Sequence, residues 1–260
     1  MNDATQPSAL LTETREGAVA ILTMNYPARR NALSVPMRVE MIAALERIEA
    51  DDSVRAIVLT GAEGIFSSGG DISGMQVNTV TAGRTRFINT VRLIKLLVGG
   101  QKPIIAAVEG WAAGAGLSIA LTCDTVVAAE DARFICSFNK IGLMPDLGML
   151  HTLPARVGQG RARQVMLYGE PFDAKQAAEW GIVDHVVPKG QALAKALERA
   201  HRFDNAAPTP LSLVRRFLSR GLDEAMEMER DLQTMLFLTE DFEEGKQAFL
   251  GKRAPQFKGV

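Results

Sequence analysis

The stretch Lys102–Asp124, KPIIAAVEGWAAGAGLSIALTCD, decides how the rest of the chain is organised. IIAAV at its start is a short apolar, β-branched run of the kind that forms a buried strand. Gly114 and Gly116 then bracket Ala115, where a helix is expected to begin. Small residues let a ligand approach the backbone, and the free N–H groups of a first helical turn favour negative charge. The stretch therefore predicts a strand-to-helix turn suited to an oxyanion, although close packing alone explains the same glycines.

A second stretch, FSSGGDI at Phe66–Ile72, has the same character. It follows the strand pattern VRAIVLT at 54–60, and its paired glycines also expose backbone N–H groups. Two such turns can supply two hydrogen-bond donors to a single substrate oxygen, which is the minimum that an oxyanion hole needs. The pair of turns shifts the interpretation from packing toward a binding site.

These stretches, FSSGGDI followed by KPIIAAVEGWAAGAG and then CD, resemble the enoyl-CoA hydratase/isomerase family, the crotonase superfamily. The resemblance runs from about Leu10 to Gly259. It implies a crotonase-like spiral of ββα units with a helical C-terminal region used for trimerisation, and a homo-oligomer that is a trimer or hexamer. It also implies that the backbone N–H groups of Gly70 and Ala115, with Gly114 adjacent, polarise the thioester carbonyl of an acyl-CoA substrate.

Composition narrows the class of protein. The chain has 260 residues, of which 47% are hydrophobic and 23% charged, and its net charge is −1. These values are typical of a soluble globule, and without a basic cluster they argue against a nucleic-acid partner. No apolar run has the length of a membrane span, and MNDATQPSAL lacks a signal-peptide pattern, so a cytoplasmic protein is expected. Cys123 and Cys136 lack metal-site spacing and are interpreted as buried free thiols; no metal is expected.

Strand and helix patterns alternate along the first three quarters of the chain, which favours an α/β fold with largely parallel strand pairing. Strands are expected at 11–24 (two strands), 54–60, 104–108, 125–129, 133–136 and 184–187. Helices are expected after a Ser34 cap, at 85–97, from Ala115 or Leu117, after a cap at Asp173, and at 190–204, 209–219, 223–238 and 241–250. Residues 1–9 are expected to be loose. We expect a crotonase-like α/β core at 10–195 and a helical C-terminal region at 196–260.

The resemblance also contains an informative departure. Hydratases of this family use two glutamates, and the matching positions here are Ser118 and Phe138, neither of which can act as a carboxylate. Both are expected in the pocket, but simple hydration by a two-glutamate mechanism is disfavoured. Glu109 and Asp124, which flank the central stretch, are interpreted as packing or capping residues.

Asp146 is the candidate acid/base. It lies among apolar residues in FNKIGLMPDLG at 138–148, and burial in such surroundings raises the pKa of a carboxyl toward the range useful for a base. An exposed cap of the following helix is the alternative. The pattern GLMPDLG resembles the isomerase branch of the family, similar to phenylacetyl-CoA-epoxide isomerases, in which an aspartate at this position shuttles a proton. Family dehalogenases carry an aspartate there as a nucleophile.

Three hypotheses for the function follow. The first is an acyl-CoA isomerase that shifts a double bond through a thioester enolate, with Asp146 as acid/base. The second is an enzyme that uses Asp146 as a nucleophile or water activator, an acyl-CoA hydrolase or dehalogenase, or an enoyl-CoA hydratase in the broad family sense. The third is a non-catalytic acyl-CoA-binding protein, because both hydratase glutamates are missing.

Coenzyme A is part of the substrate, and no separate cofactor is expected. Its phosphates should meet cations, and the resemblance places its binding on residues before NALS, in the FSSGGDI turn and near the C-terminus. In the last of these, a lysine would reach the coenzyme A of a neighbouring subunit. The candidate residues are Arg29, Arg30, Ala32, Ser68, Gly69, Asp71, Ile72, Phe237 and Lys252.

Overall fold

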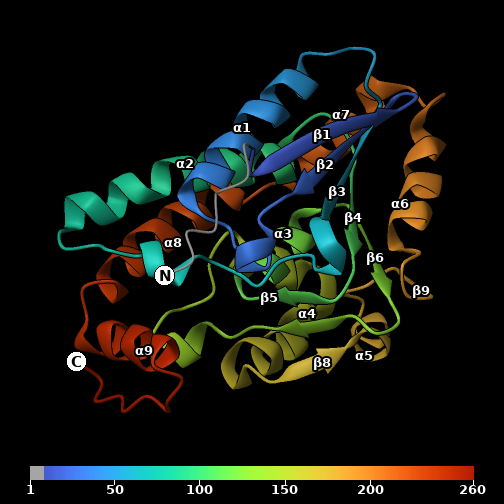
Figure 1. The fold of residues 1–260 in the computed structure, drawn as a ribbon. Coiled ribbons are helices and arrows are strands. Elements are labelled where there is room, and N and C mark those ends of the chain that lie inside the picture. Colours follow the sequence, from blue (N-terminus) through green and yellow to red (C-terminus); the bar gives the residue numbers. More distant parts are fainter. Residues whose placement is uncertain (1–8) are drawn as a thin grey trace.

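The structure is a computed structural model, and it describes residues 9–260. The sequence predicts a loose segment at residues 1–9, and residues 1–8 of that segment lie outside the described residues. A six-stranded sheet forms the centre (Figure 1), and its strand order is β1-β2-β3-β4-β6-β9. These strands are β1 (Leu11–Glu16), β2 (Val19–Met24), β3 (Ala56–Gly61), β4 (Ile104–Val108), β6 (Thr125–Ala129) and β9 (His185–Val187). Only the β1–β2 pair is antiparallel; the other four pairs are parallel, as predicted.

Helices cover both faces of this sheet (Figure 1). Along β3, Ala56 and Val58 belong to an apolar cluster with α6 (Ala192–Ala200), whereas Ile57 and Leu59 belong to the main core on the opposite face. That face is covered by α1 (Val35–Glu49), α2 (Val80–Gly99) and α3 (Ala115–Thr122). The strands are apolar on both sides because neither face of a doubly covered parallel sheet meets water.

A smaller sheet, β5-β7-β8, lies beside the large one. Its strands are β5 (Trp111–Ala113), β7 (Arg133–Ile135) and β8 (Pro171–Asp173). β4, β5 and α3 follow one another as one ββα unit, and β6, β7 and α4 (Met149–Tyr168) form the next. In each unit the first strand joins the large sheet and the second joins the small one, as expected for the ββα spiral that the family resemblance implies.

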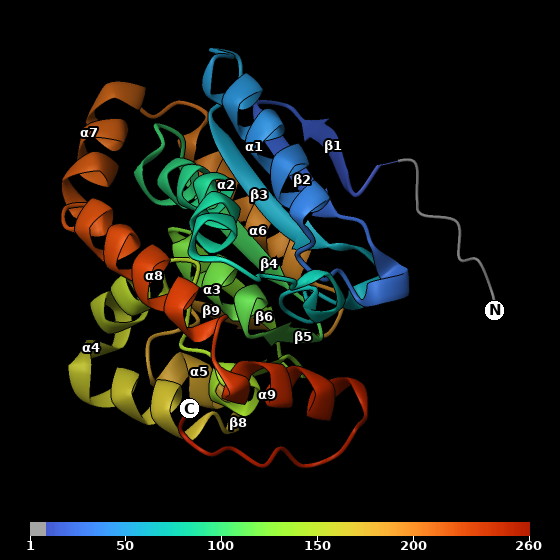
Figure 2. The same ribbon diagram turned by 90° about the vertical axis from the view of Figure 1, so that its left-hand side faces the viewer.

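The C-terminal quarter is helical, as expected. The short helix α5 (Ala174–Glu179) and then α6 lead into this region. They are followed by α7 (Pro208–Leu218), α8 (Leu222–Leu236) and α9 (Glu240–Leu250). α7 and α8 run along α2 (Figure 2), and α9 packs against the single-turn 3₁₀ helix Phe138–Ile141. Other 3₁₀ turns lie at Pro27–Arg29, Ala62–Gly64, Ile72–Gly74 and His201–Phe203. The expected boundary between residues 195 and 196 lies inside α6, and the division into two parts stays a prediction.

One expected helix boundary was wrong, and two short strands were missed. α2 begins at Val80 rather than Thr85, because the Thr79 hydroxyl accepts a hydrogen bond from the Ala82 N–H at 3.1 Å and caps an earlier turn. The three-residue strands β5 and β8 were not predicted from the sequence. Among residues 9–260, no helix combines the length and the apolarity that a membrane crossing requires.

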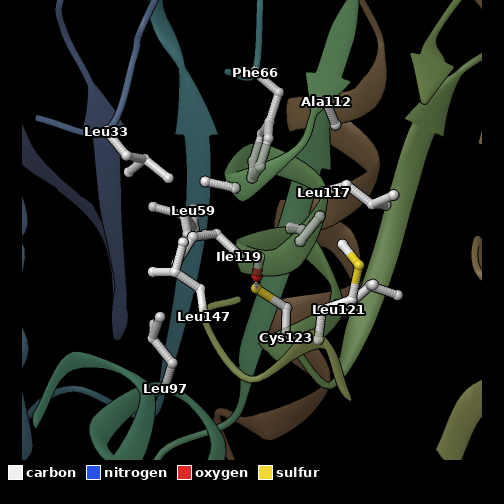
Figure 3. Packing of buried hydrophobic residues seen from close by; sticks show 14 of the residues in the cluster. Leu33, Leu59, Phe66, Leu97, Ala112, Leu117, Ile119, Leu121, Cys123 and Leu147 are labelled. Atoms are coloured by element: carbon white, nitrogen blue, oxygen red, sulfur yellow. Dashed lines mark hydrogen bonds between the residues drawn. The ribbon is translucent and has the colours of Figure 1, made fainter. Parts of the chain in front are cut away.

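The main core joins the sheet to the two glycine-rich turns. Figure 3 shows Leu59 of β3, Phe66 after it and Leu117 of α3 within one cluster, and Phe66 and Leu117 are fully buried. Cys123 and Cys136 are both buried and free, as predicted. Apolar side chains of the main core therefore hold the two glycine-rich turns against the large sheet.

The two acids that flank the central stretch have structural roles, as predicted. The Glu109 carboxylate accepts hydrogen bonds from the N–H groups of Gly190 and Ala192, at the beginning of α6. Asp124 accepts one from the Ile104 N–H and forms an ion pair with Arg215 of α7. Arg215 is buried and also donates to two carbonyl groups at the end of α2, so a single side chain ties α7 to α2 and β4.

We predict that Arg215→Met lowers the free energy of unfolding by about 2 to 3 kcal/mol, measured by urea denaturation. The variant leaves two carbonyl groups and a carboxylate without their donor, and because Asp124 is partly exposed the loss falls below that of a fully buried pair. The control is Arg216→Met, an exposed neighbour on the same helix, which should change stability by less than about 0.5 kcal/mol. Equal stabilities of the two variants would contradict the prediction.

Candidate active site

A cavity of about 270 Å³ opens where the FSSGGDI turn meets the beginning of α3. Most of its wall comes from the segment 68–75, the Gly114–Ala115 turn, the segment 137–146 and the end of α9, and Arg29, Ala32 and Arg38 complete it. Most of the lining is apolar, with Met75, Phe138, Ile141 and Leu143 among the contributors. An apolar pocket with a few polar groups is the usual form of a small-molecule site.

Backbone contacts hold the two glycine-rich turns together. The Ser67 N–H donates to the Trp111 carbonyl at 2.8 Å, and the Ala113 N–H donates to the Ser67 carbonyl at 3.0 Å. Gly69 has φ of +108°, and a Cβ at this position would lie 2.8 Å from the Ala113 carbonyl oxygen. A Cβ on Gly116 would lie 2.7 Å from the Ser67 carbonyl oxygen. Close packing therefore explains these two glycines, and this packing brings the two turns side by side.

Two backbone N–H groups at this junction lack an acceptor. Neither Gly70 nor Ala115 donates a hydrogen bond to any of the described residues, and both residues line the cavity. Gly114 differs, because its N–H already donates to the Ile135 carbonyl at 2.8 Å. Gly114, expected next to the donors, therefore has no free N–H of its own to offer. Its φ of +49° instead turns the chain into α3, whose first residue is Ala115.

Asp146 is buried at the wall of the cavity, with 7% of its surface exposed. Its Oδ2 accepts a hydrogen bond from Gln233 Nε2 at 3.4 Å, and its Oδ1 has no partner among the described residues. Burial raises the pKa of Asp146 above its ordinary value, while Arg38, the Gln233 bond and Arg86 oppose the shift. The alternative of an exposed helix cap is wrong, because Gly148 precedes α4 as its cap residue.

Sequence reasoning missed four polar residues around Asp146. Arg38 of α1 lines the cavity and is 4% exposed, and its guanidinium donates to the Thr90 hydroxyl at 2.9 Å. Glu229 and Gln233, one turn apart on α8, are fully buried. Arg86 of α2 adds a second positive charge, whose influence on Asp146 lowers the pKa of that carboxyl. Burial and the Asp146 charge together raise the pKa of Glu229.

A sequence signal for these residues exists at two positions. Arg38 directly follows Met37 on the apolar face of α1, where a charged side chain has to find a buried partner. Glu229 and Gln233 are spaced four apart on α8, together with the buried Met226, so a polar pair occupies the inner face of that helix. Neither pattern reveals that the partner is Asp146, because the segments concerned are far apart in the sequence.

Most of the predicted coenzyme A residues lie at the cavity. Those that line it are Arg29, Ala32, Ser68, Gly69, Asp71 and Ile72. Phe138, which was expected in the pocket, lines the cavity as well. Lys140 also lines it and was not assigned a role from the sequence. Among residues 9–260, no group of three or more histidine, cysteine or acidic side chains lies close enough to hold a metal ion.

Four predicted site residues are absent from the cavity lining. Ser118 is fully buried and its hydroxyl donates to the Gly114 carbonyl at 3.4 Å, so its place in the pocket was predicted wrongly. Phe237 is buried within its own chain, with its ring centroid 5.0 Å from that of Phe242. Arg30 and Lys252 both adopt positive φ, in turns outside the lining.

Comparison with known proteins agrees with this architecture. A family model described as enoyl-CoA hydratase/isomerase matches residues 14–260. A 1,2-epoxyphenylacetyl-CoA isomerase of Escherichia coli K12 is 36% identical over 255 residues, covering 94% of this chain and 96% of the relative. A 2,3-dehydroadipyl-CoA hydratase of the same organism is 37% identical over 255 residues, covering 96% of this chain and 98% of the relative.

Solved structures show the same likeness. The crystal structure of an enoyl-CoA hydratase from Mycobacterium avium subsp. paratuberculosis K-10 superposes with a TM-score of 0.86 at 34% identity. The match covers 97% of this chain and 100% of the other. The fold is thus crotonase-like. The chain belongs to the enoyl-CoA hydratase/isomerase family.

We predict that Gly69→Ala disrupts the junction of the two turns. The added methyl group would stand 2.8 Å from a backbone carbonyl, at a φ that side chains rarely adopt, so we expect the free energy of unfolding to fall by about 2 kcal/mol or more. Acyl-CoA affinity, measured by calorimetry, should fall with it. Gly74→Ala is the control, because a Cβ there meets nothing within 4 Å. If Gly69→Ala proves as stable as Gly74→Ala, the packing argument is refuted.

Proposed function

We propose that this protein is an acyl-CoA isomerase that moves a double bond through a thioester enolate. The observation that carries the proposal is the joint placement of Gly70, Ala115 and Asp146 at the cavity. Two N–H groups that have no acceptor among residues 9–260 suit a developing oxyanion, and a buried carboxyl with one oxygen unpartnered in the same residues suits proton transfer. A bound thioester would give each of these groups a partner.

The proton transfer is assigned to Asp146. As a carboxylate it removes a proton from the carbon next to the thioester carbonyl, and it returns the proton two carbons further along the acyl chain. The negative charge that develops on the thioester oxygen is stabilised by the N–H groups of Gly70 and Ala115. Burial supports this role, because it raises the pKa of the carboxyl and makes it a stronger base near neutral pH.

Isomerisation is favoured over hydration by the side chains at two positions. Ser118 is fully buried in α3, and Phe138 places only an aromatic ring at the cavity. Neither residue supplies a carboxylate, whereas the two-glutamate mechanism for adding water requires one at each of these positions. The relatives include proteins named as isomerases and proteins named as hydratases, and both names are compatible with an acyl-CoA substrate. The proposal therefore depends on this chain's own residues.

Coenzyme A is proposed to lie along the FSSGGDI turn. Arg29 and Lys140 line the cavity and carry the positive charges that phosphates need. Arg30 and Lys252 stay candidates for the outer part of coenzyme A, in this subunit or a neighbouring one, while burial of Phe237 in its own chain counts against contact with another subunit.

We also propose a homo-oligomer, trimer or hexamer. α7 exposes a row of large apolar side chains, Leu213, Val214, Phe217 and Leu218, and such a surface is typical of an interface. Sedimentation equilibrium should give a mass of three or six chains. Phe217→Glu should lower that mass, whereas a monomeric parent protein would contradict the proposal.

We predict that the protein converts a 3-enoyl-CoA to the conjugated 2-enoyl-CoA and exchanges a substrate proton for deuterium in deuterated water. Asp146→Asn should lower the rate by about 10²- to 10⁴-fold, because an amide cannot carry the proton. Absorbance of the conjugated thioester and mass spectrometry of the product measure the two effects.

Acyl-CoA affinity is the internal control, since Asn has nearly the shape of Asp and should leave binding almost unchanged. Undiminished turnover by the Asp146→Asn variant would remove Asp146 from the mechanism. A covalent adduct on Asp146, visible by intact mass, would instead favour hydrolysis or dehalogenation. Binding without conversion of any acyl-CoA tested would indicate a non-catalytic acyl-CoA-binding protein.

A further inference from the structure

The turn that carries Asp146 is held by hydrogen bonds to α8, a helix that lies far away in the sequence. Leu147 has φ of +55° and Gly148 has φ of +75°, so two consecutive residues are left-handed directly after Asp146. For a leucine this conformation is unfavourable and persists only where its surroundings impose it. Leu147 is fully buried in the same apolar cluster as Leu97 and Ile119 (Figure 3), which fixes its side chain but not its N–H.

Glu229 of α8 supplies the missing backbone partner. Its Oε1 accepts a hydrogen bond from the Leu147 N–H at 2.8 Å, and its Oε2 accepts one from the Gly148 N–H at 2.9 Å. With 1% of its surface exposed, this carboxyl has no access to water. A carboxylate that accepts two backbone N–H groups at once fixes both their direction and the turn that contains them.

Gln233, one helical turn further along α8, holds the other side of Asp146. Its amide accepts a hydrogen bond from the Met144 N–H at 3.3 Å and donates to the Met144 carbonyl at 3.0 Å. The same Nε2 lies 3.4 Å from Asp146 Oδ2. Residues 144–148 are therefore clamped by two side chains of one helix, with the candidate acid/base between the clamped positions.

The hydrogen bonds from α8 also bring the Glu229 carboxyl close to Asp146, and the Asp146 charge raises the pKa of Glu229. Arg38 of α1 lowers the pKa of both carboxyls, and Arg86 of α2 lowers that of Asp146. The thiol of Cys136, in the segment after β7, has its own pKa raised by the Asp146 charge. Burial raises the pKa of both carboxyls, and two negative charges in one buried site oppose each other. Such carboxyls release their protons in two steps that belong to the pair.

We propose, on the basis of the isomerase function proposed above, that Glu229 is a positioning residue for Asp146. It holds the left-handed turn at 147–148 and shares the negative charge of the buried site with Asp146. Glu229 reaches Asp146 through the backbone of the next two residues and not through substrate. The helix α8 thereby determines both the direction and the charge state of a carboxyl more than eighty positions earlier in the chain.

The test compares Glu229→Gln with the parent protein in the 3-enoyl-CoA exchange reaction. The amide can accept only one of the two N–H groups, so we expect kcat to fall on the order of 10- to 100-fold with little change in KM. Across the pH profile of kcat, the upper ionisation step of the parent should disappear or move to lower pH, because the like charge is gone. An unshifted profile would overturn the shared-charge inference.

Two further variants separate charge from position. Gln233→Leu removes the bonds to Met144 and Asp146 but keeps both carboxyls, so kcat should fall while the upper ionisation step stays. Glu227→Gln, an exposed position on the same helix, should change neither kcat nor the profile. If the Glu229→Gln variant fails to fold, Glu229→Asp takes its place; its shorter carboxylate should lower kcat and keep the step.

A measurement without substrate keeps this inference separate from the proposed function. Because both carboxyls have raised pKa values in the folded state, these two groups hold more protons in the native chain than in the unfolded chain above about pH 5. Their contribution to the free energy of unfolding should therefore fall as pH rises from about 5 to about 8. Urea denaturation across this range should give a flatter dependence for the Glu229→Gln variant. Equal slopes would refute the coupling even if no acyl-CoA is converted.

Discussion

The backbone contact between the turns at 66–70 and 111–115 is the constraint on which the site depends. Ser67 exchanges hydrogen bonds with Trp111 and Ala113, and the glycines at 69 and 116 leave room for carbonyl groups where other residues would place a Cβ. The turns can meet because parallel strands β3 and β4 are neighbours in the sheet and end at the same edge. Two N–H groups from separate segments then face one cavity.

The proposed oxyanion donors and the proposed acid/base are held by different parts of the fold. The backbone donors belong to the α/β core, where the sheet fixes their positions. Asp146 belongs to a turn that no strand supports, and the polar residues of α8 fix it instead. The helix α8 is therefore part of the proposed site, and a movement of α8 against α1 and α2 would displace the Asp146 carboxyl.

The electrostatics of the site follow from burial. Two carboxyls and two guanidinium groups approach one another where little water is present, so each charge depends on the others for compensation. Burial raises the pKa of Asp146 and of Glu229, whereas Arg38 lowers the pKa of both and Arg86 lowers that of Asp146. A carboxyl balanced in this way can both accept and return a proton.

The sequence by itself determined the fold class and the two turns, because these depend on local signals: glycine spacing and β-branched runs. A motif within one segment also singled out Asp146, whose role as acid/base stays a proposal. The sequence did not distinguish a free donor from a hydrogen-bonded N–H at Gly114, and it placed Ser118 in a pocket from which helix α3 excludes it. Arg38, Glu229 and Gln233 became visible only in the tertiary structure. Their partner lies in a segment far away in the sequence, and no local pattern encodes which distant charges share one buried site.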